Sequence, residues 1–82
     1  MPAYPRELNH RARAMLRAVA ARRALMSCSC EPDLFVDGVA CCDQLTAHEL
    51  ARHGLIRPAS PGNAGARVPA ELTAAGEAAL AG

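Results

Sequence analysis

The chain has 82 residues and therefore forms one small domain. It contains 19 alanines, one Phe, one Tyr and no Trp, so its large apolar side chains suffice for a thin core and not for a roomy enzyme cleft. No apolar run approaches the roughly 18 residues of a membrane span, and none resembles the core of a secretory signal. We therefore expect a cytoplasmic protein that is not an enzyme and has no small-molecule substrate.

Charge is distributed unevenly along the chain. The formal net charge is +1, but residues 1–23 hold six arginines against one acidic residue, and the remainder holds three arginines against seven acidic residues. This balance excludes a uniformly basic nucleic-acid binder. It still allows a protein that contacts nucleic acid through one face.

The first third of the sequence predicts a flexible arm and a long helix. Residues 1–5 include two prolines and form the arm, and residues 6–82 form a single domain. A helix is predicted from Arg6 to Met26, because apolar residues recur there at helical spacing: Leu8, Ala12, Met15, Leu16, Val19 and Met26. Arg13 and Arg17 lie on a separate polar face of this helix, which is either solvated or a ridge that contacts phosphates.

The middle of the sequence is irregular and then becomes helical. Residues 34–36 are a short apolar run that fits either a strand or one turn of helix, and Asp37-Gly38 indicates a turn. A second helix is predicted over 43–53, with Asp43 as its N-cap. Gly54 suits the left-handed position that follows a helix, and Leu55 can then fold back on the last turn.

The last third predicts a hairpin and a final helix. Residues 55–57 begin a strand that Pro58 ends, residues 58–66 form a loop rich in Gly and Pro, and residues 67–72 return as a strand. Pro69 lacks an N–H group, so this second strand is predicted to lie at a sheet edge. Thr73 caps a helix from Ala74 to Ala81.

Two passages carry a resemblance to a known family. The first passage resembles the end of a recognition helix that enters a wing, and it reads Leu50-Ala51-Arg52-His53-Gly54-Leu55-Ile56. The second resembles the start of the helix that follows the wing, and it reads Leu72-Thr73-Ala74-Ala75-Gly76-Glu77-Ala78-Ala79-Leu80. Together with the loop between them, they are similar to the winged helix-turn-helix family of small bacterial regulators of the MarR and PadR types. The resemblance implies a mainly α fold with a small β-hairpin, the wing at about 57–72. The usual second helix has little room between Met26 and Asp43, and the long dimerisation helices of larger members are missing, so a homodimer is not implied.

The resemblance also implies contacts with double-stranded DNA. The helix at 43–53 would enter the major groove, where Arg52 can bridge guanine O6 and N7. The implied contact residues are Gln44, Thr46, His48 and Arg52 on this helix, Arg67 on the wing, and Arg13 and Arg17 on the first helix. On this basis the favoured function is a DNA-binding transcription regulator or accessory factor.

Two side chains on the same helix favour a different function. Glu49 repels phosphates, and Leu45 is predicted to face outward, where it suits a protein partner better than DNA. The alternative is therefore a protein-interaction module with Leu45 and the region of Phe35 in its contact surface, optionally stapled by zinc.

Four cysteines crowd into 15 residues: Cys28, Cys30, Cys41 and Cys42. Zinc bound by four thiolates would staple a small domain that lacks core. The spacings Cys-x-Cys and Cys-Cys differ from the usual two-residue gap, and Cys41 and Cys42 can converge only if the backbone bends. Buried thiols that fill the core, and a redox or iron–sulfur sensor, remain the other interpretations.

Overall fold

The computed structural model describes residues 8–81, and the predicted arm at 1–5 lies outside them. These described residues form three helices and five strands. Their bounds are α1 His10–Ala20, β1 Ala24–Ser27, β2 Leu34–Val36, β3 Val39–Ala40, α2 Gln44–Arg52, β4 Ile56–Pro58, β5 Arg67–Leu72 and α3 Ala74–Ala81.

The five strands form one antiparallel sheet in the order β3-β2-β1-β5-β4. The domain is therefore an α+β fold, and the prediction of a mainly α protein with a small hairpin is wrong. The difference arises between β1 and α2, where the helix of a helix-turn-helix motif would stand. Residues 34–40 form the short strands β2 and β3 around the turn at Asp37-Gly38, and they extend the sheet beyond β1.

The predicted first helix is also too long. The structure ends α1 at Ala20, where Arg22 adopts a left-handed φ of 62°. The N–H groups of Arg22 and Arg23 then donate to the carbonyls of Val19 and Ala18, which is the bonding pattern of a Schellman motif. Met26 is buried as predicted, but it reaches the core from β1 and not from a helix.

Strand β5 lies inside the sheet, between β1 and β4, so the prediction of an edge strand at Pro69 is wrong. The Pro69 carbonyl accepts a hydrogen bond from the N–H of Ala59 at 2.8 Å. The N and C=O of one strand residue point to the same side, so the missing N–H of Pro69 also faces Ala59. The proline is tolerated because β4 ends at Pro58, one residue before Ala59. The sheet therefore needs no N–H donor from Pro69 on that side.

The second and third predicted helices are confirmed. Asp43 caps α2, since its carboxylate accepts from the Thr46 N–H at 3.0 Å, and Gly54 follows the helix with a φ of 74°. Before α3, the Thr73 N–H donates to the Leu55 carbonyl at 3.1 Å and the Thr73 hydroxyl to the Gly54 carbonyl. These bonds fasten the start of α3 to the end of α2.

Gly76 allows α3 to approach the chain after α2 closely. A Cβ atom added at Gly76 would lie 2.0 Å from the carbonyl oxygen of Leu55. The glycine in the Leu-Thr-x-x-Gly passage is therefore required by packing against the Leu55 backbone.

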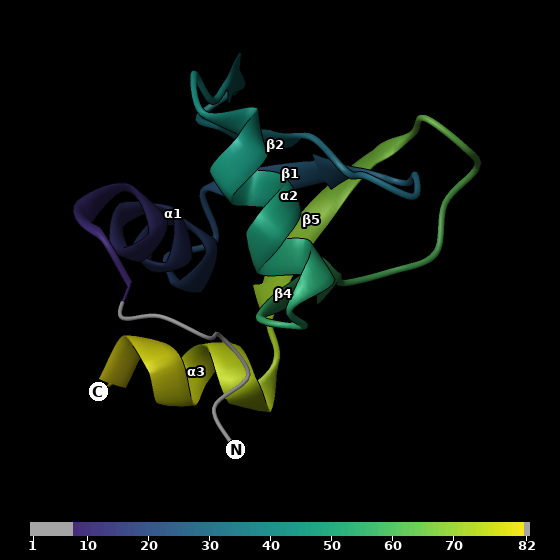
Figure 1. Ribbon diagram of the computed structural model, residues 1–82. Coiled ribbons are helices and arrows are strands. Elements are labelled where there is room, and N and C mark those ends of the chain that lie inside the picture. Colours follow the sequence, from purple (N-terminus) through teal and green to yellow (C-terminus); the bar gives the residue numbers. More distant parts are fainter. Residues whose placement is uncertain (1–7, 82) are drawn as a thin grey trace.

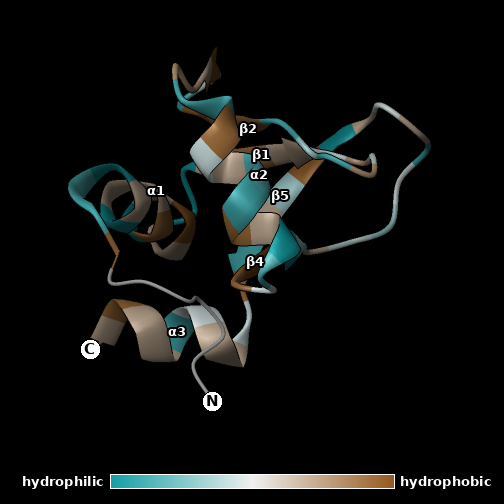
Figure 2. Cartoon of the chain, in the orientation of Figure 1, coloured by the Kyte–Doolittle hydropathy of each residue, from teal (hydrophilic) through white to brown (hydrophobic). Residues whose placement is uncertain are grey.

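All three helices lie on one side of the sheet, so the domain has two layers (Figure 1). The core between the layers is built from alternate strand residues and one stripe of each of α1 and α2; its largest fully buried side chains are Leu16, Met26, Leu34, Leu50 and Leu55. In Figure 2, α1 and α2 each carry both hydrophobic (brown) and hydrophilic (teal) segments, as expected of helices that bury one face. Across residues 8–81, no helix has the length and apolar character needed to cross a membrane.

Candidate functional site

The outward face of α2 carries Leu45, Glu49 and Arg52, which are spaced at i, i+4 and i+7 and so share one side of the helix. Leu45 is 70 % exposed, an unusual value for a large apolar side chain. The opposite face packs into the core through Ala47 and Leu50. The sequence-based prediction that Leu45 points outward is confirmed.

Two of the predicted DNA-contacting residues on α2 are engaged inside the fold. The Gln44 side-chain amide accepts from the Leu34 N–H at 2.9 Å and donates to the carbonyls of Leu34 at 2.9 Å and Cys41 at 3.0 Å. Thr46 is only 8 % exposed, and its hydroxyl donates to the Asp43 carboxylate at 2.6 Å. Gln44 thus ties α2 to β2, and Thr46 completes the helix cap.

The other two predicted residues on α2 face acidic side chains. His48 Nε2 lies 2.9 Å from an Asp33 carboxylate oxygen, and an Arg52 guanidinium nitrogen lies 3.3 Å from the Glu31 carboxylate. Both acids belong to the segment that joins β1 to β2. Together with Glu49, they place three carboxylates around the exposed face of α2.

Arg67 does not share a surface with α2. In the sheet register it pairs with Ser27, while Leu25 pairs with both Phe35 and Pro69, so these side chains occupy the sheet face without helices. The Arg67 guanidinium carbon lies 4.0 Å from the centre of the Phe35 ring, a cation–π contact on this face. The structure therefore separates the predicted wing contact from the predicted recognition helix.

The first helix supplies the most basic stretch of the described chain. Residues 10–23 hold five arginines and no acidic residue. Arg13 donates to the Leu80 carbonyl at 3.1 Å and so links α1 to α3, whereas Arg17 is exposed in the last turn of α1. The Arg17 side chain is therefore accessible to a phosphate, whereas the Arg13 side chain is bonded to α3.

Cys28 lies in a different place from Cys41 and Cys42, and Cys30 is exposed. Cys28 lies beneath the β4–β5 loop, because a Cβ atom built on Gly62 would stand 3.0 Å from its sulfur. Cys41 and Cys42 line a groove on the other half of the sheet. No group of three or more His, Cys, Asp or Glu side chains in residues 8–81 is arranged to hold a metal ion. Zinc bound by all four thiolates stays a prediction, and it would need Cys28 to move toward Cys41 and Cys42.

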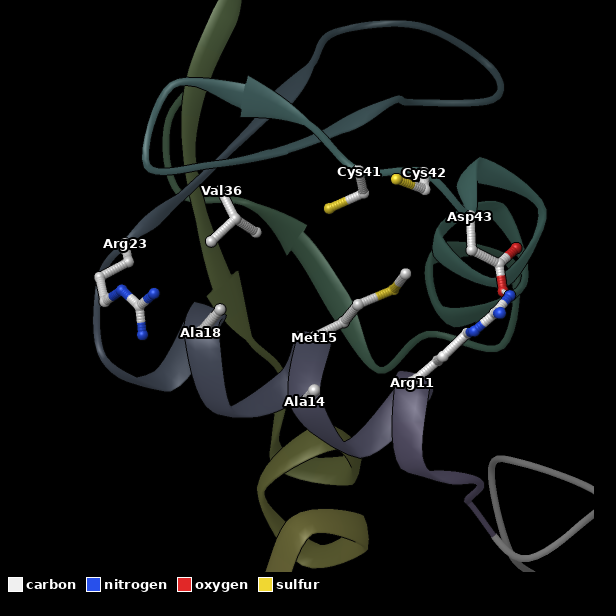
Figure 3. A pocket seen from close by; sticks show the side chains of 9 residues that line it. All are labelled: Arg11, Ala14, Met15, Ala18, Arg23, Val36, Cys41, Cys42 and Asp43. Carbon is white, nitrogen blue, oxygen red and sulfur yellow. Dashed lines mark hydrogen bonds and ion pairs between the residues drawn. The ribbon is translucent and has the colours of Figure 1, made fainter.

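The groove lies between α1 and the β2–β3 end of the sheet and has a volume of about 580 Å³ (Figure 3). Its walls are formed by Ala14, Met15, Ala18 and Val36, together with the two cysteines. An ion pair stands at each end. Arg11 lies 3.3 Å from Asp43, and Arg23 lies 2.6 Å from Asp37.

The ionisable groups along the groove respond to these surroundings. Burial raises the pKa of the Cys41 thiol, with smaller contributions from the charges of Cys42 and Asp43. Hydrogen bonds from Thr46, and then the Arg11 guanidinium, lower the pKa of Asp43. Cys41 is therefore a protonated, weakly reactive thiol at neutral pH.

Several of these features left no mark in the sequence. The acidic partners Glu31 and Asp33 and the groove beside α1 depend on how the segment between β1 and α2 folds. The strands in that segment have only three and two residues, which is too short for an alternation of apolar and polar residues to be recognised in the sequence. The adjacent pair Cys41-Cys42 was the one visible signal of the groove.

The chain matches no known family model, and no curated protein or solved structure is detectably similar to it.

Proposed function

We propose that this protein is a protein-interaction module that binds its partner through the outward face of α2. The single observation that carries the proposal is the exposed Leu45 side chain, presented at the start of a helix whose other face is anchored in the core. A second exposed apolar residue, Val39, lies on the edge strand β3 and is 68 % exposed. Only Cys41, Cys42 and Asp43 separate β3 from α2, so both residues belong to one end of the domain.

The charges around α2 support a protein partner over DNA. Both cationic candidates on this helix already have acidic neighbours, and Glu49 adds a further carboxylate to the same face. DNA phosphates would have to approach three carboxylates to reach one arginine. A protein surface can complement Leu45, Glu49 and Arg52 together, since it presents apolar groups and charges of both signs.

The test compares capture of partners by immobilised wild-type protein and by a Leu45→Glu variant. Burying a leucine side chain contributes about 1.5–3 kcal/mol, so the variant is expected to weaken a purified partner's affinity by roughly 10- to 100-fold. Ala78→Glu is the matched control, because it introduces the same charge at an exposed position on α3. An affinity unchanged by Leu45→Glu, or weakened equally by Ala78→Glu, would refute the proposal.

A second candidate function is binding of double-stranded DNA, and the arginine-rich α1 segment favours it. Arg17 is exposed, and residues 10–23 carry no acid to repel a phosphate. The exposed ion pair of Arg52 with Glu31 is a weak barrier, because such surface pairs contribute about 1 kcal/mol or less. The resemblance of residues 50–56 and 72–80 to the winged helix-turn-helix family supports this candidate as well.

Fluorescence anisotropy with a labelled duplex separates the two candidates. For a DNA-binding protein, the logarithm of the association constant falls linearly with the logarithm of the salt concentration. The slope has a magnitude of about 0.9 for each phosphate that the protein neutralises. Arg17→Ala is then expected to reduce the slope by about one, and Arg52→Ala to weaken binding, while the neutral substitution Leu45→Ala has the smaller effect. No binding to the duplex at low salt would eliminate this candidate.

A further inference from the structure

We propose that Cys41, Cys42 and Met15 form a binding site for a soft monovalent metal ion, Cu(I). The chain bends at Cys42, just before the N-cap of α2, and both cysteines line the same groove despite being adjacent. Met15 enters the groove from α1 on the opposite wall. Figure 3 shows Cys41 and Cys42 next to each other on one wall of the groove, with the Met15 side chain extending toward that wall from α1.

The donor atoms decide which metal fits. Thiolate and thioether ligands select Cu(I), whereas Zn²⁺ in structural sites takes four ligands from Cys, His and carboxylates. The groove lining includes no histidine. Its nearest carboxylate, Asp43, already accepts bonds from the backbone and hydroxyl of Thr46 and pairs with Arg11. Two thiolates and one thioether therefore favour a low-coordinate Cu(I) ion.

The surroundings of the three sulfurs suit such an ion. Met15 is buried, and Ala14, Ala18 and Val36 add apolar side chains to the walls of the groove. Each thiol releases its proton to solvent when it binds the metal, so the occupied site carries one net negative charge. The ion pairs of Arg11 with Asp43 and of Arg23 with Asp37 stand at the two ends of the groove, so the carboxylates there are already neutralised and add little to that charge. Because protons compete for Cys41, the affinity is expected to rise with pH.

The test is an anaerobic titration of the whole chain with Cu(I), in competition with a chromogenic Cu(I) chelator. The wild-type protein is expected to bind one ion tightly, and Cys42→Ser to lose it. Cys42 is exposed, so this substitution leaves the core intact. The double variant Cys28→Ser/Cys30→Ser is the matched control and is expected to retain the ion. Met15→Leu preserves packing and is expected to weaken binding without loss of the fold.

X-ray absorption of the copper-loaded protein reports the ligands directly, and three sulfur neighbours are expected. Equal loss of copper from the Cys42 variant and from the Cys28/Cys30 variant would overturn the proposal in favour of a site shared by all four cysteines. Retention of a tightly bound ion by Cys42→Ser, or unchanged affinity in Met15→Leu, would overturn it as well. The readout is independent of partner or DNA binding, so the site is tested separately from the proposed function.

Discussion

Gly76→Ala is the substitution for which helix propensity and packing make opposite predictions. In an exposed helix interior, alanine is more favourable than glycine by about 1 kcal/mol. Propensity alone therefore predicts a more stable protein. At Gly76, however, the new methyl carbon would lie 2.0 Å from the Leu55 carbonyl oxygen, which is far too close for a carbon and an oxygen that are not bonded to each other.

Relief of this contact requires α3 to move away from the chain that follows α2. Overpacking of this kind typically costs about 1–3 kcal/mol. The movement also strains the Thr73 N–H bond to Leu55, and loss of one such bond costs about 1 kcal/mol. After the gain in propensity is subtracted, we expect Gly76→Ala to destabilise the protein by about 2 kcal/mol, which corresponds to roughly 10 °C in the midpoint of thermal unfolding.

Circular dichroism during heating and during urea titration measures this difference. Ala78→Gly is the control in the same helix, since Ala78 is exposed, and it is expected to cost about 1 kcal/mol through propensity alone. A Gly76→Ala protein that is as stable as the wild type, or more stable, would show that α3 does not approach Leu55 in this way.

The remaining predictions concern the segment where β3 leads into α2. Gln44→Ala removes three hydrogen bonds to Leu34 and Cys41, and urea denaturation is expected to show a loss of about 2 kcal/mol; Gln44→Glu is expected to cost at least as much, because its carboxylate would face the carbonyl oxygens of Leu34 and Cys41. The pKa of Asp43 is lowered in the folded state, so its contribution to stability is complete at neutral pH and is lost as the pH falls below about 4. Asp43→Ala should therefore lower the unfolding midpoint at pH 7, and the gap to the wild type should close in acid; a gap that persists at low pH would contradict the capping role.

Sequence reasoning succeeded where the signal is local. Asp43, Gly54 and Thr73 mark helix ends through their own side chains or backbone freedom, and α2 and α3 were placed within a residue of their bounds. It failed where the partner is distant. Met26 fits both a helical stripe and the alternation of a strand, and only its pairing with Val68 decides between them.

The end of α1 and the place of β5 illustrate the same difficulty. The helix stops at a left-handed Arg22, although glycine usually occupies that position. Pro69 suggested a sheet edge, but its missing N–H coincides with the end of β4. For the candidate site, the exposure of Leu45 was predictable from the helical wheel. The engagement of Gln44 was not, because it depends on the strand at Leu34.

The order of strands in the sheet also governs when the domain can fold. β1 lies in the first third of the chain, and one of its two neighbours is β5, which comes some forty residues later. Pairing across such a distance delays folding, since the intervening chain must be ordered first. On the ribosome, β1 and β2 would emerge with an open edge that only the last strand can close. A chain that stops before Arg67 would retain that edge and would be prone to aggregate.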